Sequence, residues 1–226
     1  MTNPKIYWRK IKIKKEHSCP NVSLFRFISD LKFNYKNKKI LELGFGHGAD
    51  IYQFKKRGSD VYGIDINKSA VQTLKEKYRI KNSKCMDVVK QTEFFNKVKF
   101  NLIYHRDLIY YLSDIEIKKL QNNVYQNLKK NGLYLFQFIE NDMKIKKNET
   151  RFRKINKNYL SNFNNKKFAE KNNPLRFLNV SEIFKITKKA GFILIGKKVL
   201  IESYGQNESK LRVNRYLMFK KNENIN

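Results

Sequence analysis

The stretch Ile40–Gly48, with the sequence ILELGFGHG, decides the fold of this chain. It indicates a short apolar strand over Lys39–Leu43, with an acidic residue near its end, and a glycine-rich turn that opens a helix. One helix later, a second apolar strand over Val61–Ile64 ends at Asp65. Two such strands, each ending in an acidic residue, are typical of an open parallel sheet that holds a nucleoside at its edge.

The same alternation of strands and helices continues along the chain. It is typical of βαβ units, which form a parallel sheet with helices on both faces. The connection between the last two predicted strands is too short for a crossover helix, so the last of seven strands is expected to run antiparallel. Helices are predicted around Leu24–Leu31, Ile115–Leu128 and Ser181–Ala190, and further strands near Cys85–Asp87 and over Phe100–Tyr104, Leu133–Ile139, Phe192–Glu202 and Arg215–Phe219.

Two segments fall outside this rhythm. Residues 1–21 are basic with scattered aromatic side chains and are expected to form an N-terminal arm. Residues 141–179 carry 11 Lys and Arg against 3 acidic residues, and they are too many for a simple connection. We expect them to form an inserted basic lid or helical cap on a single domain made of residues 22–140 and 180–221.

The composition is strongly basic, with a formal net charge of +29. Such a charge fits either a nucleic-acid surface or a lysine-rich solvated surface, and composition alone leaves both open. The two cysteines lie far apart, so we expect neither a disulfide framework nor a metal site. The N-terminus has no apolar signal region and no window is long enough to span a bilayer, so we expect a soluble, cytoplasmic protein.

The glycine turn and the two acidic residues predict the cofactor. Gly44 and Gly46 allow close approach of the backbone to a ligand, and the Asp65 carboxylate can accept hydrogen bonds from two ribose hydroxyls. These features also satisfy a nicotinamide dinucleotide fingerprint. Glu42 distinguishes a dinucleotide from a sulfonium-bearing cofactor. A carboxylate at this position would repel a pyrophosphate but would favour a ligand that carries an ammonium and a sulfonium. The residues therefore favour S-adenosylmethionine.

Four runs of sequence resemble one known family. Glu42–Gly48 resembles motif I of the class I S-adenosylmethionine-dependent methyltransferases, and Val61–Ile66 resembles their motif II. Phe100–Leu112 is similar to their motif IV region, and Asn127–Leu133 to the turn before their fifth strand. The resemblance implies a Rossmann-like methyltransferase sheet, with S-adenosyl-L-methionine as methyl donor and S-adenosyl-L-homocysteine as product.

The resemblance also implies roles by position. The glycine turn would pass under the methionine part of the cofactor, Asp65 would bind the ribose, and Asp87 would contact the adenine amino group. Phe45, Asn101 and Asn131 depart from the usual residues of the family, although none of them removes a ligand. The full set of implied cofactor-binding residues is Glu42, Gly44, Phe45, Gly46, Asp65, Ile66, Asp87 and His105.

Candidates for the chemistry follow the fourth strand. His105 could act as a general base near neutral pH, and a packed core histidine is the competing interpretation. Tyr111 is the second catalytic candidate. Arg106 could bind an anionic substrate, with Tyr110 lining the same pocket.

The methyl acceptor is less well defined. The loop after the fourth strand lacks the proline motif of nucleic-acid amino-methyltransferases. Neither cysteine lies near this loop, where 5-methylcytosine methyltransferases need a cysteine nucleophile. We therefore expect a small anionic acceptor, such as a sugar, a nucleotide-linked sugar or a phosphate-type intermediate of bacterial surface polysaccharide biosynthesis. One alternative is ribose O-methylation of RNA held by the basic insert. The other is a non-catalytic cofactor-binding subunit.

Overall fold

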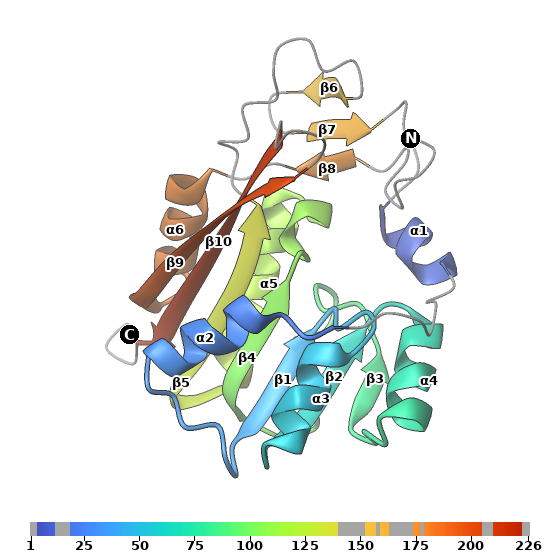
Figure 1. Cartoon of the computed structure of the whole chain (residues 1–226), viewed down its shortest axis with the longest axis vertical. Coiled ribbons are helices and arrows are strands. Elements are labelled where there is room, and N and C mark those ends of the chain that lie inside the picture. The colour runs from blue at the N-terminus through green and yellow to red at the C-terminus, as the bar shows by residue number, and fades with distance from the viewer. Residues whose placement is uncertain are drawn as a thin grey trace.

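The computed structural model describes residues 4–11, 19–139, 152–156, 159–162, 174–176, 179–204 and 210–222. Seven strands form one sheet in the order β3-β2-β1-β4-β5-β10-β9 (Figure 1). The strands are β1 (Lys39–Leu43), β2 (Asp60–Asp65), β3 (Ser83–Cys85), β4 (Phe100–Arg106), β5 (Leu128–Ile139), β9 (Phe192–Tyr204) and β10 (Lys210–Lys221). Strand β10 runs antiparallel to both of its neighbours, β5 and β9, and the other six strands of this sheet share one direction. The predicted fold class is therefore confirmed.

Helices cover both faces of this sheet. Side chains of α2 (Val22–Asp30), α3 (Ala49–Lys56) and α4 (Lys68–Lys77) pack into the core of one face. Side chains of α5 (Asp114–Asn127) and α6 (Val180–Lys189) pack into the core of the other face, which also receives η1 (Ile109–Tyr111). Burial of these apolar faces drives the assembly, at roughly 1.5–3 kcal/mol for each large side chain removed from water.

Local sequence signals set the helix ends. The side chain of Asn67 accepts a bond from the Ala70 amide and caps α4. Ser113 and Glu116 form a reciprocal capping box at the start of α5. The cap of α6 is Asn179, whose side chain accepts from the Ser181 amide, so the helix begins at Val180, one residue before the predicted start.

Strand β5 differs from expectation in its start. It begins at Leu128 rather than Leu133, because Leu128 pairs with Phe100 before the register shifts and pairing with β4 resumes at Leu133. Asn131, which has a φ of +57°, lies within this irregular stretch. The expected turn is therefore an irregularity at the start of the strand rather than a separate loop.

Two additional pieces lie outside the main sheet. Helix α1 (Pro4–Lys10) forms within the predicted arm. Within the predicted insert, β6 (Phe152–Asn156), β7 (Tyr159–Asn162) and β8 (Pro174–Arg176) form a small antiparallel sheet (Figure 1). Strand β8 contacts η1. The basic side chains that suggested a lid lie outside the described part of the chain. Among the described helices, none is both long enough and apolar enough to cross a membrane.

Candidate functional site

The glycine turn forms a cradle at the carboxyl ends of β1 and β2. The Gly44 amide donates to the Ile64 carbonyl oxygen at 2.7 Å. Gly46 has a φ of +51°, and a Cβ placed on it would meet no atom within 4 Å, so the space above it is open. The ring of Phe45 is buried, and a Cβ on Gly63 of β2 would approach it to 2.9 Å. Phe45 therefore contributes backbone rather than side chain to the cradle.

Asp65 closes the other side of this cradle. Its Oδ2 accepts from the Gly46 amide at 2.8 Å, and its Oδ1 accepts from the Asn67 amide at 2.8 Å. Burial raises the pKa of Asp65, while these backbone donors lower it. Each carboxylate oxygen can accept a further bond, so the pair can take two hydroxyl groups. Ile66 follows directly and is partly exposed.

Glu42 lies beneath the turn and is buried. Its Oε2 accepts from the Tyr104 hydroxyl at 2.7 Å and from the Ile51 amide at 3.1 Å, in the first turns of α3. Burial and the nearby charge of Asp50 raise the pKa of Glu42 well above its usual value, although the bond from Tyr104 opposes this. Both bonds end on Oε2, so they do not occupy Oε1.

A second carboxylate, Asp50, holds Arg106 in place. Its Oδ2 accepts from Arg106 Nε at 2.5 Å, and its Oδ1 accepts from the Asn21 amide at 2.6 Å. Sequence reasoning missed Asp50. The available signal was an acidic residue in the first helical turn after the glycine motif, a place that the helix dipole favours.

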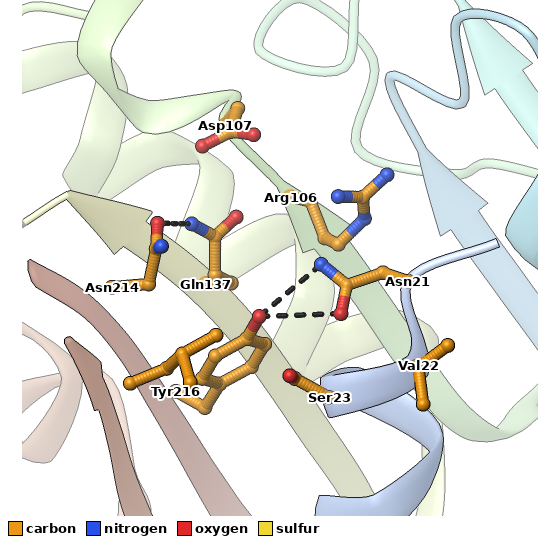
Figure 2. A pocket seen from close by; sticks show the side chains of 9 residues that line it. Asn21, Val22, Ser23, Arg106, Asp107, Gln137, Asn214 and Tyr216 are labelled. Atoms are coloured by element: carbon orange, nitrogen blue, oxygen red, sulfur yellow. Dashed lines mark hydrogen bonds between the residues drawn. The ribbon is translucent and has the colours of Figure 1, made fainter. Parts of the chain in front are cut away.

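A pocket of about 400 Å³ opens beside Arg106 (Figure 2). Its polar walls come from the start of α2, the ends of β4 and β5, and strand β10. It lies next to the glycine turn, because Leu108 follows the pocket residue Asp107 and would contact a Cβ on Gly44 at 3.3 Å. The polar side chains that line it are Asn21, Ser23, Arg106, Asp107, Gln137, Asn214 and Tyr216.

Comparison with known proteins identifies the domain. Residues 40–132 match a family model described as a methyltransferase domain. A solved structure of an S-adenosylmethionine-dependent methyltransferase from Methanosarcina mazei aligns with a TM-score of 0.71 at 13% identity, over 89% of this chain and 98% of that one. Residues 40–132 therefore form a methyltransferase domain, and the described sheet has the fold of an S-adenosylmethionine-dependent methyltransferase.

Two proteins similar to this domain are named for, or were solved with, a phosphoethanolamine-type acceptor. Phosphoethanolamine N-methyltransferase from Plasmodium falciparum is 33% identical over 114 residues, which are 49% of this chain and 42% of that protein. The chain thus spans less than half the length of this relative. A Haemonchus contortus enzyme solved with phosphomonomethylethanolamine and S-adenosylhomocysteine aligns with a TM-score of 0.59 at 14% identity, over 89% of this chain and 52% of that one.

The open cradle of the methyltransferase domain fits S-adenosylmethionine. The space above Gly46 accepts a ligand where a side chain would intrude, and Asp65 offers two acceptors to a ribose. Structures of the same fold hold S-adenosylhomocysteine, including a Burkholderia thailandensis enzyme that covers 88% of this chain with a TM-score of 0.61. These observations support the predicted cofactor over a nicotinamide dinucleotide.

His105 does not lie in this site, which argues against its predicted roles. Its side chain is completely buried, its Nε2 bonds the Tyr134 hydroxyl at 2.8 Å, and its ring stacks on Phe136. Burial lowers the pKa of His105 to about 3. Along a strand, side chains alternate between faces, so Tyr104 and Arg106 face the site while His105 faces the opposite core. The packed-histidine interpretation fits this geometry.

Helix α1 approaches the expected adenine side of the site. Lys5 Nζ bonds the Asp87 carboxylate at 3.1 Å and the Glu116 carboxylate at 2.6 Å. The ring of Trp8 packs edge-on against Tyr111, with centroids 5.4 Å apart. Asp87 and Tyr111, both predicted from sequence, thus lie where α1 meets the domain.

Proposed function

We propose that this methyltransferase domain transfers the methyl group of S-adenosylmethionine to a small anionic acceptor bound beside Arg106. The observation that supports this is the orientation of Arg106. Among the described residues, only Asp50 bonds its guanidinium, through Nε, so both terminal nitrogens remain available at the pocket. A guanidinium held in this way presents a two-pronged donor suited to phosphate or carboxylate.

The cofactor would be held by residues at the glycine turn. Backbone groups of Gly44 and Gly46 would contact the methionine part, and Asp65 would accept from the ribose hydroxyls. Glu42 would attract the ammonium group. Ile66 would pack against the adenine, and the cofactor supplies an activated methyl group on its sulfonium for in-line displacement.

The charges of the pocket favour an acceptor that carries both signs. Arg106 lies beside Asp107, whose carboxylate accepts from the Tyr110 hydroxyl. Arg106 would bind an anionic group and Asp107 an ammonium, which would place the acceptor next to the cofactor methyl. Phosphoethanolamine, the acceptor named for the relatives, has both groups. A sugar phosphate or nucleotide-linked sugar of surface polysaccharide biosynthesis would use Arg106 alone.

Methyl transfer from labelled S-adenosylmethionine tests this proposal. Phosphoethanolamine, a nucleotide-linked sugar and RNA are offered separately to the wild type, to Arg106→Lys and to Arg26→Lys. The proposal predicts turnover of a small anionic acceptor by the wild type. In Arg106→Lys the KM for that acceptor should rise at least tenfold, because lysine keeps the positive charge but lacks the two parallel N–H donors of the guanidinium. Arg26 is exposed on α2, so its variant is the matched control.

Three results would contradict the proposal. Methylation of RNA alone, with affinity that falls steeply with salt, would favour the RNA alternative. Cofactor binding without transfer to any of the three acceptors would favour a non-catalytic subunit. An unchanged KM in Arg106→Lys would remove Arg106 from acceptor binding.

A further inference from the structure

The side-chain amide of Gln137 on β5 also borders the pocket proposed for the methyl acceptor. Only 2% of Gln137 is exposed. Its Nε2 donates to Asn214 Oδ1 on β10 at 2.8 Å. Its Oε1 is buried, and no described group donates a hydrogen bond to it. Figure 2 shows this oxygen on the side of the amide that faces Arg106.

Strand pairing brings Gln137 and Arg106 together. The two residues are direct partners in the parallel β4–β5 register. Partner positions in neighbouring strands carry side chains on the same face of a sheet. Both side chains line the same pocket, so one ligand can contact both of them.

A buried hydrogen-bond acceptor that receives no hydrogen bond is uncommon in folded proteins. One in the wall of a pocket points to a ligand that donates the missing hydrogen bond. We propose that Gln137 is a specificity-determining residue of the acceptor site. Its Oε1 accepts a hydrogen bond from a hydroxyl or ammonium group of the methyl-accepting substrate, whose anionic group is bound by Arg106. This inference rests on the proposed function and restricts its substrate class to small anions that also carry such a donor.

Asn214 acts as a positioning residue for this amide. Because Asn214 Oδ1 accepts from Gln137 Nε2, the amide nitrogen is directed to β10 and the oxygen to the pocket. Without a hydrogen-bond acceptor at position 214, the Gln137 amide could rotate and present its nitrogen to the ligand. The site would then lose its preference for ligands that carry a hydrogen-bond donor.

Calorimetry in the presence of S-adenosylhomocysteine tests the inference with three probes. Phosphoethanolamine carries an ammonium, glucose 1-phosphate carries hydroxyls, and ethyl phosphate carries the anionic group with neither. We expect the wild type to bind at least one donor-bearing phosphate about tenfold more tightly than ethyl phosphate. Gln137→Met should abolish this affinity ratio between the donor-bearing phosphate and ethyl phosphate, and it should leave the affinity for ethyl phosphate unchanged. Gln126→Met, on the exposed face of α5, is the matched control.

Variants at position 214 separate positioning from simple packing. Asn214→Ala should reduce the same ratio, whereas Asn214→Asp keeps an acceptor for Gln137 Nε2 and should retain it. The affinity of each variant for S-adenosylhomocysteine shows whether the domain has folded. A purely structural role would change stability without changing the ratio.

The outcomes distinguish this inference from the proposed function. Equal wild-type binding of all three phosphates, tighter binding of ethyl phosphate, or a ratio that survives Gln137→Met would overturn the inference. The proposed function would still stand if Arg106→Lys weakened the binding of all three phosphates. Failure of the wild type to bind any phosphate would contradict the proposed function and the inference that rests on it.

Discussion

Arg106 and Asp50 form an ion pair of 2.5 Å that joins the end of β4 to the first turn of α3. Asp50 is 1% exposed, and its other oxygen accepts the Asn21 amide, so a single carboxylate also fixes the start of α2. Burial alone would lower the pKa of Arg106, but the charges of Asp50, Glu42 and Asp107 outweigh it and raise that pKa. The guanidinium is therefore both charged and oriented before any acceptor arrives.

Removing the charge of Asp50 should destabilise the protein. Asp50→Asn leaves Arg106 largely buried without its counter-ion. Loss of one partner from a fully buried pair costs about 3–5 kcal/mol, and the side chain of Arg106 is 30% exposed, so we expect about 2 kcal/mol. Urea unfolding measures the loss. The double variant with Arg106→Met should recover part of it, and an Asp50→Asn protein as stable as the wild type would show that the pair contributes nothing.

Gly46→Ala should weaken S-adenosylmethionine binding more than it weakens the fold. The φ of +51° strains an alanine by about 1–2 kcal/mol, while the added Cβ meets no protein atom and would project into the space assigned to the cofactor. Calorimetry should show at least tenfold weaker binding of S-adenosylmethionine. NAD, titrated into the wild type, should show no binding.

Gly58→Ala is the matched control for this strain. Gly58 has a φ of +84° after α3, and a Cβ there meets only Lys36 at 3.5 Å, an ordinary contact. Its variant should lose similar stability and keep full cofactor affinity. Equal losses of affinity in both variants would mean that backbone strain, rather than the cradle, controls binding.

The sequence predicted the sheet closely because its signals are local. Strand β1 has the predicted bounds Lys39–Leu43, and β10 enters antiparallel as the short connection required. The cofactor cradle was equally local, since its glycines and Asp65 lie in two adjacent motifs. The start of β5 was misplaced because the turn residues Asn131 and Gly132 are tolerated within an irregular strand.

The acceptor pocket could not be predicted in the same way. Gln137 and Asn214 lie on β5 and β10, and only the strand order brings them near Arg106. Asp50 lies on α3 and reaches Arg106 through the packing of that helix on the sheet. The burial of His105 was within reach of the sequence. Since Arg106 was expected in the acceptor pocket, alternation along β4 assigns the residue before it, His105, to the opposite face.

Acid should destabilise the protein through His105. Burial holds the pKa of His105 at about 3 in the folded state, against about 6.5 when unfolded. Below pH 6.5 the unfolded chain binds the additional proton, so this contribution is complete above that pH and is lost as the pH falls toward 3. By pH 5 the loss should be about 2 kcal/mol. Urea unfolding at pH 7.5 and pH 5 measures it.

The double variant His105→Phe with Tyr134→Phe isolates this effect. It removes both partners of the buried hydrogen bond, so neither is left unsatisfied. Glu42 and Asp65, whose pKa values burial raises, titrate in both proteins and cancel in the comparison. The pH-dependent loss should shrink by about 2 kcal/mol while methyl transfer continues. Loss of turnover in a folded variant would instead restore His105 as a catalytic candidate.

Lys5→Gln should loosen helix α1. Lys5 bonds the carboxylates of Asp87 and Glu116. Other contacts that hold this segment include the Trp8–Tyr111 ring contact and the bonds from the Asn67 side-chain amide to the Trp8 and Ile11 carbonyl oxygens at 2.6 and 2.7 Å. Loss of a partly exposed ion pair costs about 1 kcal/mol, which corresponds to about fivefold more frequent local opening. Trypsin should then cut after the exposed residues Arg9 and Lys10 about five times faster.

Lys68→Gln is the control for this measurement, because Lys68 is exposed on α4 and its loss also removes one positive charge. Its cleavage after Arg9 and Lys10 should match that of the wild type. Since α1 meets the domain at Asp87, S-adenosylhomocysteine should slow the cutting in both proteins if that carboxylate lies at the cofactor. Cleavage of Lys5→Gln at the wild-type rate would show that the bonds to Asp87 and Glu116 do not hold α1 in place.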